Sequence, residues 1–196
     1  MRAQGSQAHI LISMINLRIY DPRILAIDLR RRRFGFSVFE GPRRLIGWGV
    51  RFYPANDESE AALMGKRLAA LLAVYSPSAI VVTKEQWDRA LSDTEIRTLV
   101  EEILRLAEAN DITVRGVGHT MVRQSFVSMQ SGTKHEIANS LARIFPELSS
   151  RLPPARRTWE SEHSIMTMFD ATALGLSFWL QDSEFIFIPD HLADVR

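Results

Sequence analysis

The sequence has no cysteine, only three lysines and no long apolar run. The lack of cysteine excludes a disulfide framework, a zinc–thiolate site and a cysteine nucleophile, and it fits a reducing cytoplasm, which is the expected location. No stretch approaches the roughly 20 apolar residues of a membrane span, so we expect no membrane association. The apolar patch at residues 10–17 lacks the basic start and the small-residue cleavage site of a signal peptide.

The length of 196 residues and the hydrophobic fraction of 46% fit one domain with a sizeable core. We expect a flexible extension over residues 1–22, one domain over residues 23–182 and a tail over residues 183–196. A short apolar segment in that tail, residues 185–189, is predicted to pack on the body or to pair with an edge strand.

Positive charge is carried mainly by arginine and is clustered, although the formal net charge is only +1. Arginine runs occur at residues 30–33, 43–44 and 156–157. Because the guanidinium group grips phosphate through a planar fork of donors, such clusters favour nucleic-acid binding even in a nearly neutral chain. The alternatives are that the arginines are solvated faces or, for residues 30–33, that they pair with Glu40 and other acids.

Alternating apolar and turn segments predict an α/β fold. Three strands joined by short turns, at residues 23–29, 34–39 and 44–52, form an antiparallel meander. A helix capped by Asp57 runs to Tyr75, and two further strands are separated by a helix from Ser92 or Asp93 to Asn110. These two strands are at residues 78–83 and 112–117, and the first is apolar enough to be buried on both faces. We therefore predict a mixed five-stranded sheet, a meander plus two parallel strands, flanked by helices.

The last third of the chain is predicted to be helical. Residues 119–129 favour no single structure, residues 134–145 form a helix, and residues 146–157 form a connection. The final helix is expected over residues 160–180. It is apolar almost all round, which predicts burial, and it contains Asp170.

Three acids are the candidates for chemistry: Asp28 at the end of the first strand, Glu85 at the end of the fourth, and Asp170 in the last helix. Sites in α/β sheets form outside the carboxyl ends of the parallel strands, and carboxylates gathered there repel unless a cation lies between them. Oxygen donors select hard ions such as Mg²⁺ or Mn²⁺, and two such ions can drive in-line attack on a phosphodiester. An arginine partner is the alternative for Asp28 and for Asp170.

The order of these elements and acids resembles the RNase H-like nuclease superfamily, and within it the RuvC-type Holliday junction resolvases. The matching segments are ILAIDLRRRRFGFSVFE, AIVVTKEQW, GTKHEIANSLARIF and FDATALGLSFW. The resemblance implies an RNase H-like sheet with Asp28, Glu85 and Asp170 as catalytic ligands of Mg²⁺ or Mn²⁺. It also implies a DNA substrate and a role in recombination or repair.

The chain departs from the resolvase pattern at two places. Leu29 and Arg30 stand where the family has a Pro-Gly turn, and Thr167 stands where it has an acid or a histidine three residues before the last aspartate. His163, seven residues before Asp170, is our candidate for a further metal ligand, because this spacing would place both on one helix face. The alternative for His163 is a helix cap or a surface residue.

Six basic residues are predicted to contact DNA phosphates. Lys84 would point to the opposite strand face from Glu85, and Lys134 would combine with helix N-terminal N–H groups as a phosphate seat, unless it simply begins a capped helix. The full set is Arg30, Arg31, Arg32, Arg33, Lys84 and Lys134.

These features predict a metal-dependent, structure-selective endonuclease that hydrolyses branched DNA such as Holliday junctions. A homodimer would match the two-fold symmetry of a four-way junction. One alternative is a catalytically inactive RNase H-like module that binds nucleic acid or a partner. Another is a sugar-kinase or actin-like ATPase, which the four arginines disfavour because they stand where a glycine-rich phosphate loop is needed.

Overall fold

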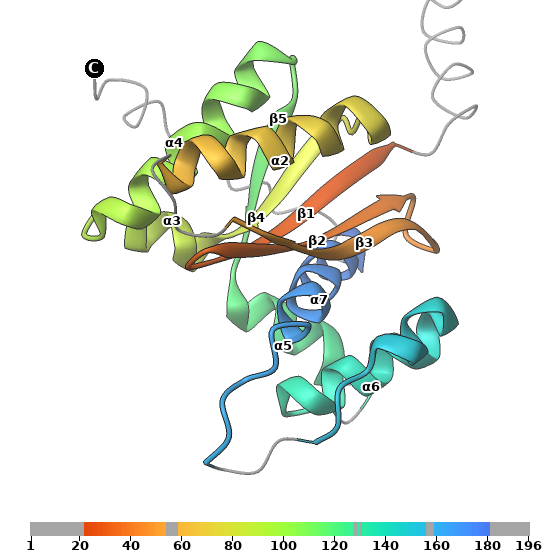
Figure 1. Ribbon diagram of the computed structural model, residues 1–196. Helices are drawn as coiled ribbons and strands as arrows, with labels where there is room; N and C mark the ends of the chain where they lie inside the picture. The colour runs from red at the N-terminus through yellow and green to blue at the C-terminus, as the bar shows by residue number, and fades with distance from the viewer. Residues whose placement is uncertain (1–21, 54–58, 128, 130, 156–158, 181–196) are drawn as a thin grey trace, which may run out of the picture.

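The computed structural model describes residues 22–53, 59–127, 129, 131–155 and 159–180. Five strands form one sheet in the order β3-β2-β1-β4-β5 (Figure 1). The first three strands pair antiparallel, and β4 and β5 continue the sheet parallel to β1, so the predicted mixed sheet is confirmed. The strands are β1 (Arg23–Arg30), β2 (Arg33–Glu40), β3 (Arg44–Phe52), β4 (Ala79–Thr83) and β5 (Thr113–Val117).

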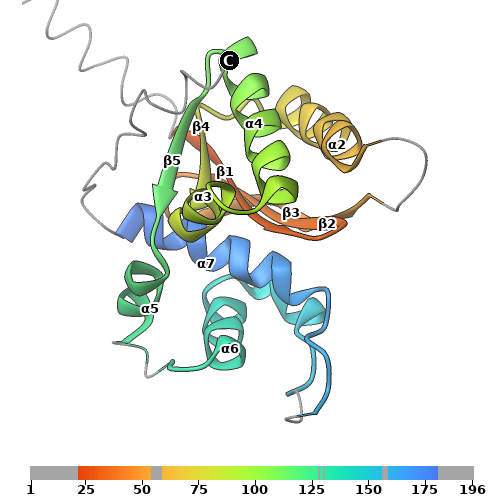
Figure 2. The ribbon, with the colours of Figure 1, turned by 90° about the vertical axis from the view of Figure 1, so that its left-hand side faces the viewer.

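Helices cover both faces of the sheet and bury two separate apolar clusters (Figure 2). One face carries α2 (Glu60–Tyr75), α3 (Lys84–Ala90) and α4 (Thr94–Ala109). The other face is covered by α7, and α5 and α6 pack beyond it. These elements are α5 (His119–Val127), α6 (Lys134–Ile144), the short 3-10 helix η1 (Pro146–Arg151) and α7 (Met166–Leu180).

The pleat of β1 decides which face receives its polar residues. Successive side chains of a strand point to opposite faces. Leu25 and Ile27 lie in the cluster under α2 and α4, whereas Ile24 and Ala26 lie in the cluster around α7. Asp28, two residues after Ala26, therefore faces α7.

Two glycines let α7 approach the sheet at backbone distance. A Cβ built on Gly35 of β2 would lie 2.0 Å from the carbonyl oxygen of Thr167, and one on Gly175 would lie 2.4 Å from the ring of Phe39. The helix is buried along most of its length. This close packing fixes the position of Asp170 relative to the end of β1.

Several predicted boundaries are corrected. The last helix begins at Met166 rather than at residue 160, because residues 160–163 are exposed and only from Met166 onward does burial against the sheet support a helix. Lys84 and Glu85 begin α3 instead of extending β4, so they are not on opposite strand faces. Ser59 caps α2 by accepting a hydrogen bond from the backbone N–H of Ala62.

Other predictions concern parts of the chain that the structure leaves undescribed. Asp57, the tail over residues 183–196 and almost all of the extension over residues 1–22 lie outside the described residues. Within the described part, none of the helices has both the length and the apolar character needed to cross a membrane.

The approach of β2 to α7 gives a first prediction. Gly35→Ala should lower the free energy of unfolding by about 1–3 kcal/mol or more, because the added methyl meets backbone that must move. Urea unfolding measures the loss. Gly116→Ala is the matched control, because the nearest atom to its Cβ is 3.9 Å away. Equal losses in the two variants would show that α7 does not lie so close to β2.

Candidate functional site

Arg30 links the first strand to the last helix. Asp28 and Arg30 are two residues apart on one face of β1, and the Nε of Arg30 donates to Oδ2 of Asp28 at 2.8 Å. The Nη2 of the same guanidinium donates to Oδ2 of Asp170 on α7 at 2.9 Å. Asp28 is only 2% exposed, so this pairing supplies counter-charge to a desolvated carboxylate.

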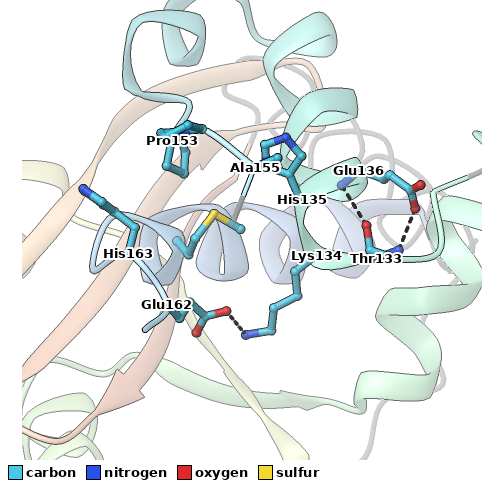
Figure 3. Close-up of a pocket in the computed structure, with 10 residues that line it drawn as sticks. Thr133, Lys134, His135, Glu136, Pro153, Ala155, Glu162 and His163 are labelled. Carbon is cyan, nitrogen blue, oxygen red and sulfur yellow. Dashed lines mark hydrogen bonds and ion pairs between the residues drawn. The ribbon is translucent and has the colours of Figure 1, made fainter. Parts of the chain in front are cut away.

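Lys134 adds a second cation from α6. Its Nζ lies 2.9 Å from Oδ2 of Asp170 and 3.0 Å from Oε1 of Glu162, and Figure 3 shows the contact with Glu162. A capping box between Thr133 and Glu136 holds the start of α6 and therefore the position of Lys134. We call the five residues Asp28, Arg30, Lys134, Glu162 and Asp170 the ion-pair cluster.

Gln86 completes the surroundings of Asp28 and was not found from the sequence. Its side-chain nitrogen donates to Oδ1 of Asp28 at 3.1 Å and to the carbonyl oxygen of Leu29 at 2.9 Å. The signal that could have found it is that no loop separates β4 from α3. Because α3 follows Thr83 directly, its third residue falls beside the end of β1.

Burial sets the proton affinity of the cluster. It raises the pKa of Asp28 to about 7, with Arg30 opposing the rise and the neighbouring Asp170 adding to it. For Arg30 and Lys134, burial acts to lower the pKa, but attraction to the carboxylates outweighs it, so the pKa of each lies above its ordinary value. Both cations therefore remain charged at neutral pH, where Asp28 itself titrates.

A cavity of about 300 Å³ opens over the cluster. Its lining includes four members of the ion-pair cluster: Asp28, Arg30, Lys134 and Asp170. It also includes His119, Val122 and Arg123 of α5. Basic side chains from β1, α5 and α6 therefore border the carboxylates. The cavity is therefore bordered by basic side chains and contains the ion pairs of Asp28 and Asp170.

His163 lies in a second hollow of about 590 Å³ beside Lys134 and Glu162 (Figure 3). Its Nδ1 accepts a hydrogen bond from the backbone N–H of Ile165 at 3.3 Å, just before α7 begins. The expected helix face shared with Asp170 does not exist, because the helix starts only at Met166. This geometry matches the alternative of a cap-like surface histidine.

Glu85 is the predicted acid that stands apart. It lies in the first turn of α3, and its Oε1 accepts a hydrogen bond from the backbone N–H of His119 at 2.7 Å. Its side chain is not among those that line the cavity over Asp28 and Asp170, although His119 is. The structure thus joins two of the three acids through Arg30 and leaves Glu85 next to their cavity.

The other predicted phosphate contacts divide into two kinds. Arg31 and Arg32 form the exposed turn between β1 and β2, with long contacts of 3.8 Å to Glu95 and 3.5 Å to Glu60. Arg33 instead turns inward, and its Nε donates to Oγ1 of Thr167 at 3.3 Å. Lys84 is exposed at the start of α3.

We tested whether these residues fit the divalent ion that the resemblance implies. Carboxylate oxygens suit Mg²⁺, but Oδ2 of Asp28 and Oδ2 of Asp170 already hold Arg30, and Asp170 also holds Lys134. Among the described residues, no group of three His, Asp or Glu side chains could hold an ion. A divalent ion 4 Å from the guanidinium would be repelled by roughly 8 kcal/mol at an effective dielectric constant of about 20. In this arrangement the residues do not fit the ion.

Comparisons with known proteins identify the fold. No protein-family model and no curated protein matches the chain. Among solved structures, Thermus thermophilus RuvC in complex with a Holliday junction substrate has a TM-score of 0.57 and 17% identity, covering 80% of this chain and 91% of that one. A second Thermus thermophilus RuvC structure has a TM-score of 0.57 and 18% identity, covering 79% and 92%. The yeast mitochondrial Holliday junction resolvase Ydc2 has a TM-score of 0.51 and 14% identity, covering 90% and 85%.

The fold is therefore that of the RNase H-like nucleases. More narrowly, the chain has the RuvC-like resolvase fold, with its meander, its parallel strands and its flanking helices. The predicted fold class and resemblance are confirmed at this level.

Asp28 gives a prediction of pH dependence. Since the pKa of Asp28 is raised in the folded chain, the folded chain binds a proton at Asp28 more tightly than the unfolded chain does between about pH 4 and 7. The stability contributed by Asp28 relative to Asn is thus fullest near pH 4 and is lost as the pH rises towards 7. Each tenfold change in proton affinity corresponds to about 1.4 kcal/mol.

Urea unfolding of the wild type and of Asp28→Asn at pH 4.5 and pH 7.5 measures this difference. The unfolding free energy of the wild type minus that of the variant should be smaller at pH 7.5. An increase with pH would mean that Arg30 outweighs burial and lowers the pKa of Asp28.

Proposed function

We propose that this chain binds branched DNA through the face that carries the cavity and the ion-pair cluster. The observation that carries the proposal is the gathering of basic side chains from β1, α5 and α6 around one cavity beside the ends of β1 and β4. Phosphate oxygens are the partners such groups suit, and the phosphate backbone dominates the affinity of nucleic-acid-binding proteins. The branched form of the DNA is inferred from the RuvC-like fold, one example of which is in complex with a Holliday junction substrate.

The exposed turn between β1 and β2 supports the same proposal. Arg31 and Arg32 have side chains that are 70% and 53% exposed, and their contacts to Glu95 and Glu60 are long. Such surface pairs stabilise a protein by about 1 kcal/mol or less, so DNA phosphates can replace them at little cost. The turn would then extend the contact beyond the cavity.

A second candidate is the metal-dependent, structure-selective endonuclease, with Mg²⁺ or Mn²⁺ as cofactor. The proximity of Asp28 and Asp170, which are 142 positions apart in the sequence, favours it, because two carboxylates meet beside the end of β1. Hydrolysis would require the carboxylates to exchange Arg30 for metal ions. A homodimer would serve both candidates, because a four-way junction has two-fold symmetry.

The arginine turn can be tested through the salt dependence of binding. The double variant Arg31→Ala, Arg32→Ala should bind a labelled four-way junction more weakly, with a log–log salt slope reduced by about 2, because two phosphate contacts are lost. Fluorescence anisotropy between about 50 and 200 mM salt measures it. Arg105→Ala removes an exposed arginine from α4, which lies on the sheet face opposite α7 and the cavity (Figure 2), and should leave the slope unchanged. An unchanged slope in the double variant would show that Arg31 and Arg32 make no contact with DNA phosphates.

Cleavage assays separate the two candidates. A labelled four-way junction and a linear duplex are incubated with Mg²⁺, with Mn²⁺ and with chelator, and both binding and cutting are followed. The binding proposal expects a junction complex in chelator and no cutting in any condition. Metal-dependent cutting that Asp28→Asn abolishes would establish the endonuclease instead. Failure to bind the junction would contradict both.

A further inference from the structure

We propose that Arg30 and Lys134 replace divalent ions as the counter-charge of Asp28 and Asp170, so that this RuvC-like site is held together without metal. The contacts that carry the proposal are the bridge from Arg30 to both carboxylates and the contact from Lys134 to Asp170. The two cations balance the two acids, and Glu162 adds a third carboxylate at the outer side of Lys134.

Arg30 is part of the scaffold rather than a loop residue that has swung inward. Its backbone pairs with Arg33 in the sheet, and its carbonyl oxygen accepts a hydrogen bond from the hydroxyl of Tyr53 at 2.9 Å. Since Asp28 precedes it by two positions on the same strand face, the pleat itself brings the guanidinium to the carboxylate. The side chain is only one-third exposed.

Lys134 arrives independently, from a different element. The capping box at Thr133 fixes the first turn of α6, which leaves the ammonium group between Asp170 and Glu162. Two cations on separate elements therefore meet at one aspartate. A single displaced side chain would not produce this arrangement.

Both departures from the resolvase pattern contribute arginine contacts. Arg30 stands where the family has the glycine of a Pro-Gly turn, and its side chain lies between the two acids. Thr167 stands where the family has a further acid or histidine, and its hydroxyl accepts a hydrogen bond from Arg33. The two changes act in the same direction, because Arg30 places a cation between the two acids, and Thr167 replaces a possible metal ligand with a hydroxyl that binds Arg33.

If Arg30 takes the place of a divalent ion, removing Arg30 should raise the affinity of the site for metal. Removing Arg30 leaves Asp28 without its counter-charge and Asp170 with Lys134 alone, which destabilises the fold and creates a site for a hard cation. The wild type should bind Mn²⁺ only weakly. Arg30→Ala should bind it at least about tenfold more tightly, since a positive charge beside the ion is gone.

The experiment titrates the full-length chain with Mn²⁺ in the absence of DNA. Bound ion is followed by electron paramagnetic resonance, and Tm is followed at constant ionic strength. We expect an unchanged Tm for the wild type, and for Arg30→Ala a lower Tm in chelator that Mn²⁺ raises. Arg30→Lys keeps the charge and should not respond to Mn²⁺. Adding Asp170→Asn to Arg30→Ala should abolish the response, which locates the ion at these carboxylates.

Tight Mn²⁺ binding by the wild type that is lost in Asp28→Asn would overturn the proposal, as would an Arg30→Ala variant with no greater affinity for Mn²⁺. Should Arg30→Ala not fold, Lys134→Ala replaces it, because that lysine is half exposed at the outer side of the cluster. Its affinity for Mn²⁺ should also exceed that of the wild type, and equal affinity would contradict the proposal. The titration contains no DNA, so its outcome is independent of whether the chain binds junctions.

Discussion

The carboxylate of Asp28 at the buried end of β1 is the constraint on which the rest of the site depends. An ionised carboxylate taken out of water costs several kcal/mol unless it is paired and hydrogen-bonded. Asp28 receives a guanidinium on one oxygen and the amide of Gln86 on the other. Burial still holds its pKa near neutrality, so the compensation is partial. The surrounding elements are arranged to keep these partners in place.

The same contacts that build the core position the site. Helix α7 reaches the sheet because Gly35 offers no side chain, and this closeness places Thr167 beside Arg33 and Asp170 beside Arg30. A change that loosens α7 would therefore disturb the charges as well as the packing. Stability and the chemistry of the cavity are coupled through one helix.

The RuvC-like fold and the contents of its cavity lead to different expectations about activity. The fold places carboxylates near the ends of neighbouring parallel strands, which is where a phosphodiester-cleaving centre can be built. Here Asp28 at the end of β1 and Asp170 on α7 are paired with arginine and lysine instead. Function is decided by such side chains rather than by topology. The cations also suit contact with phosphate groups.

The sequence alone determined the sheet. Apolar runs of strand length, short turns between the first three and helices between the later ones leave little choice of topology, and the structure has the predicted meander and the two predicted parallel strands. It also singled out Asp28 and Asp170, because acids within apolar segments are conspicuous. The start of α7 was misplaced because the polar residues before Met166 are compatible with a helix. The helix begins only where the chain enters the packed core.

Only the tertiary structure decided what neutralises the acids. The sequence predicted a metal ion at Asp28 with arginine as the alternative, and the side-chain distances that decide between them exist only in the folded chain. Arg30 was predicted to contact phosphates together with the rest of the run at residues 30–33, but the pleat places its side chain on the face of α7, while Arg31 and Arg32 form the turn. Lys134 and Gln86 reach the same cluster through helix starts whose positions follow from packing. Electrostatic pairing is set by separations of a few ångströms, and these exist only once the chain has folded.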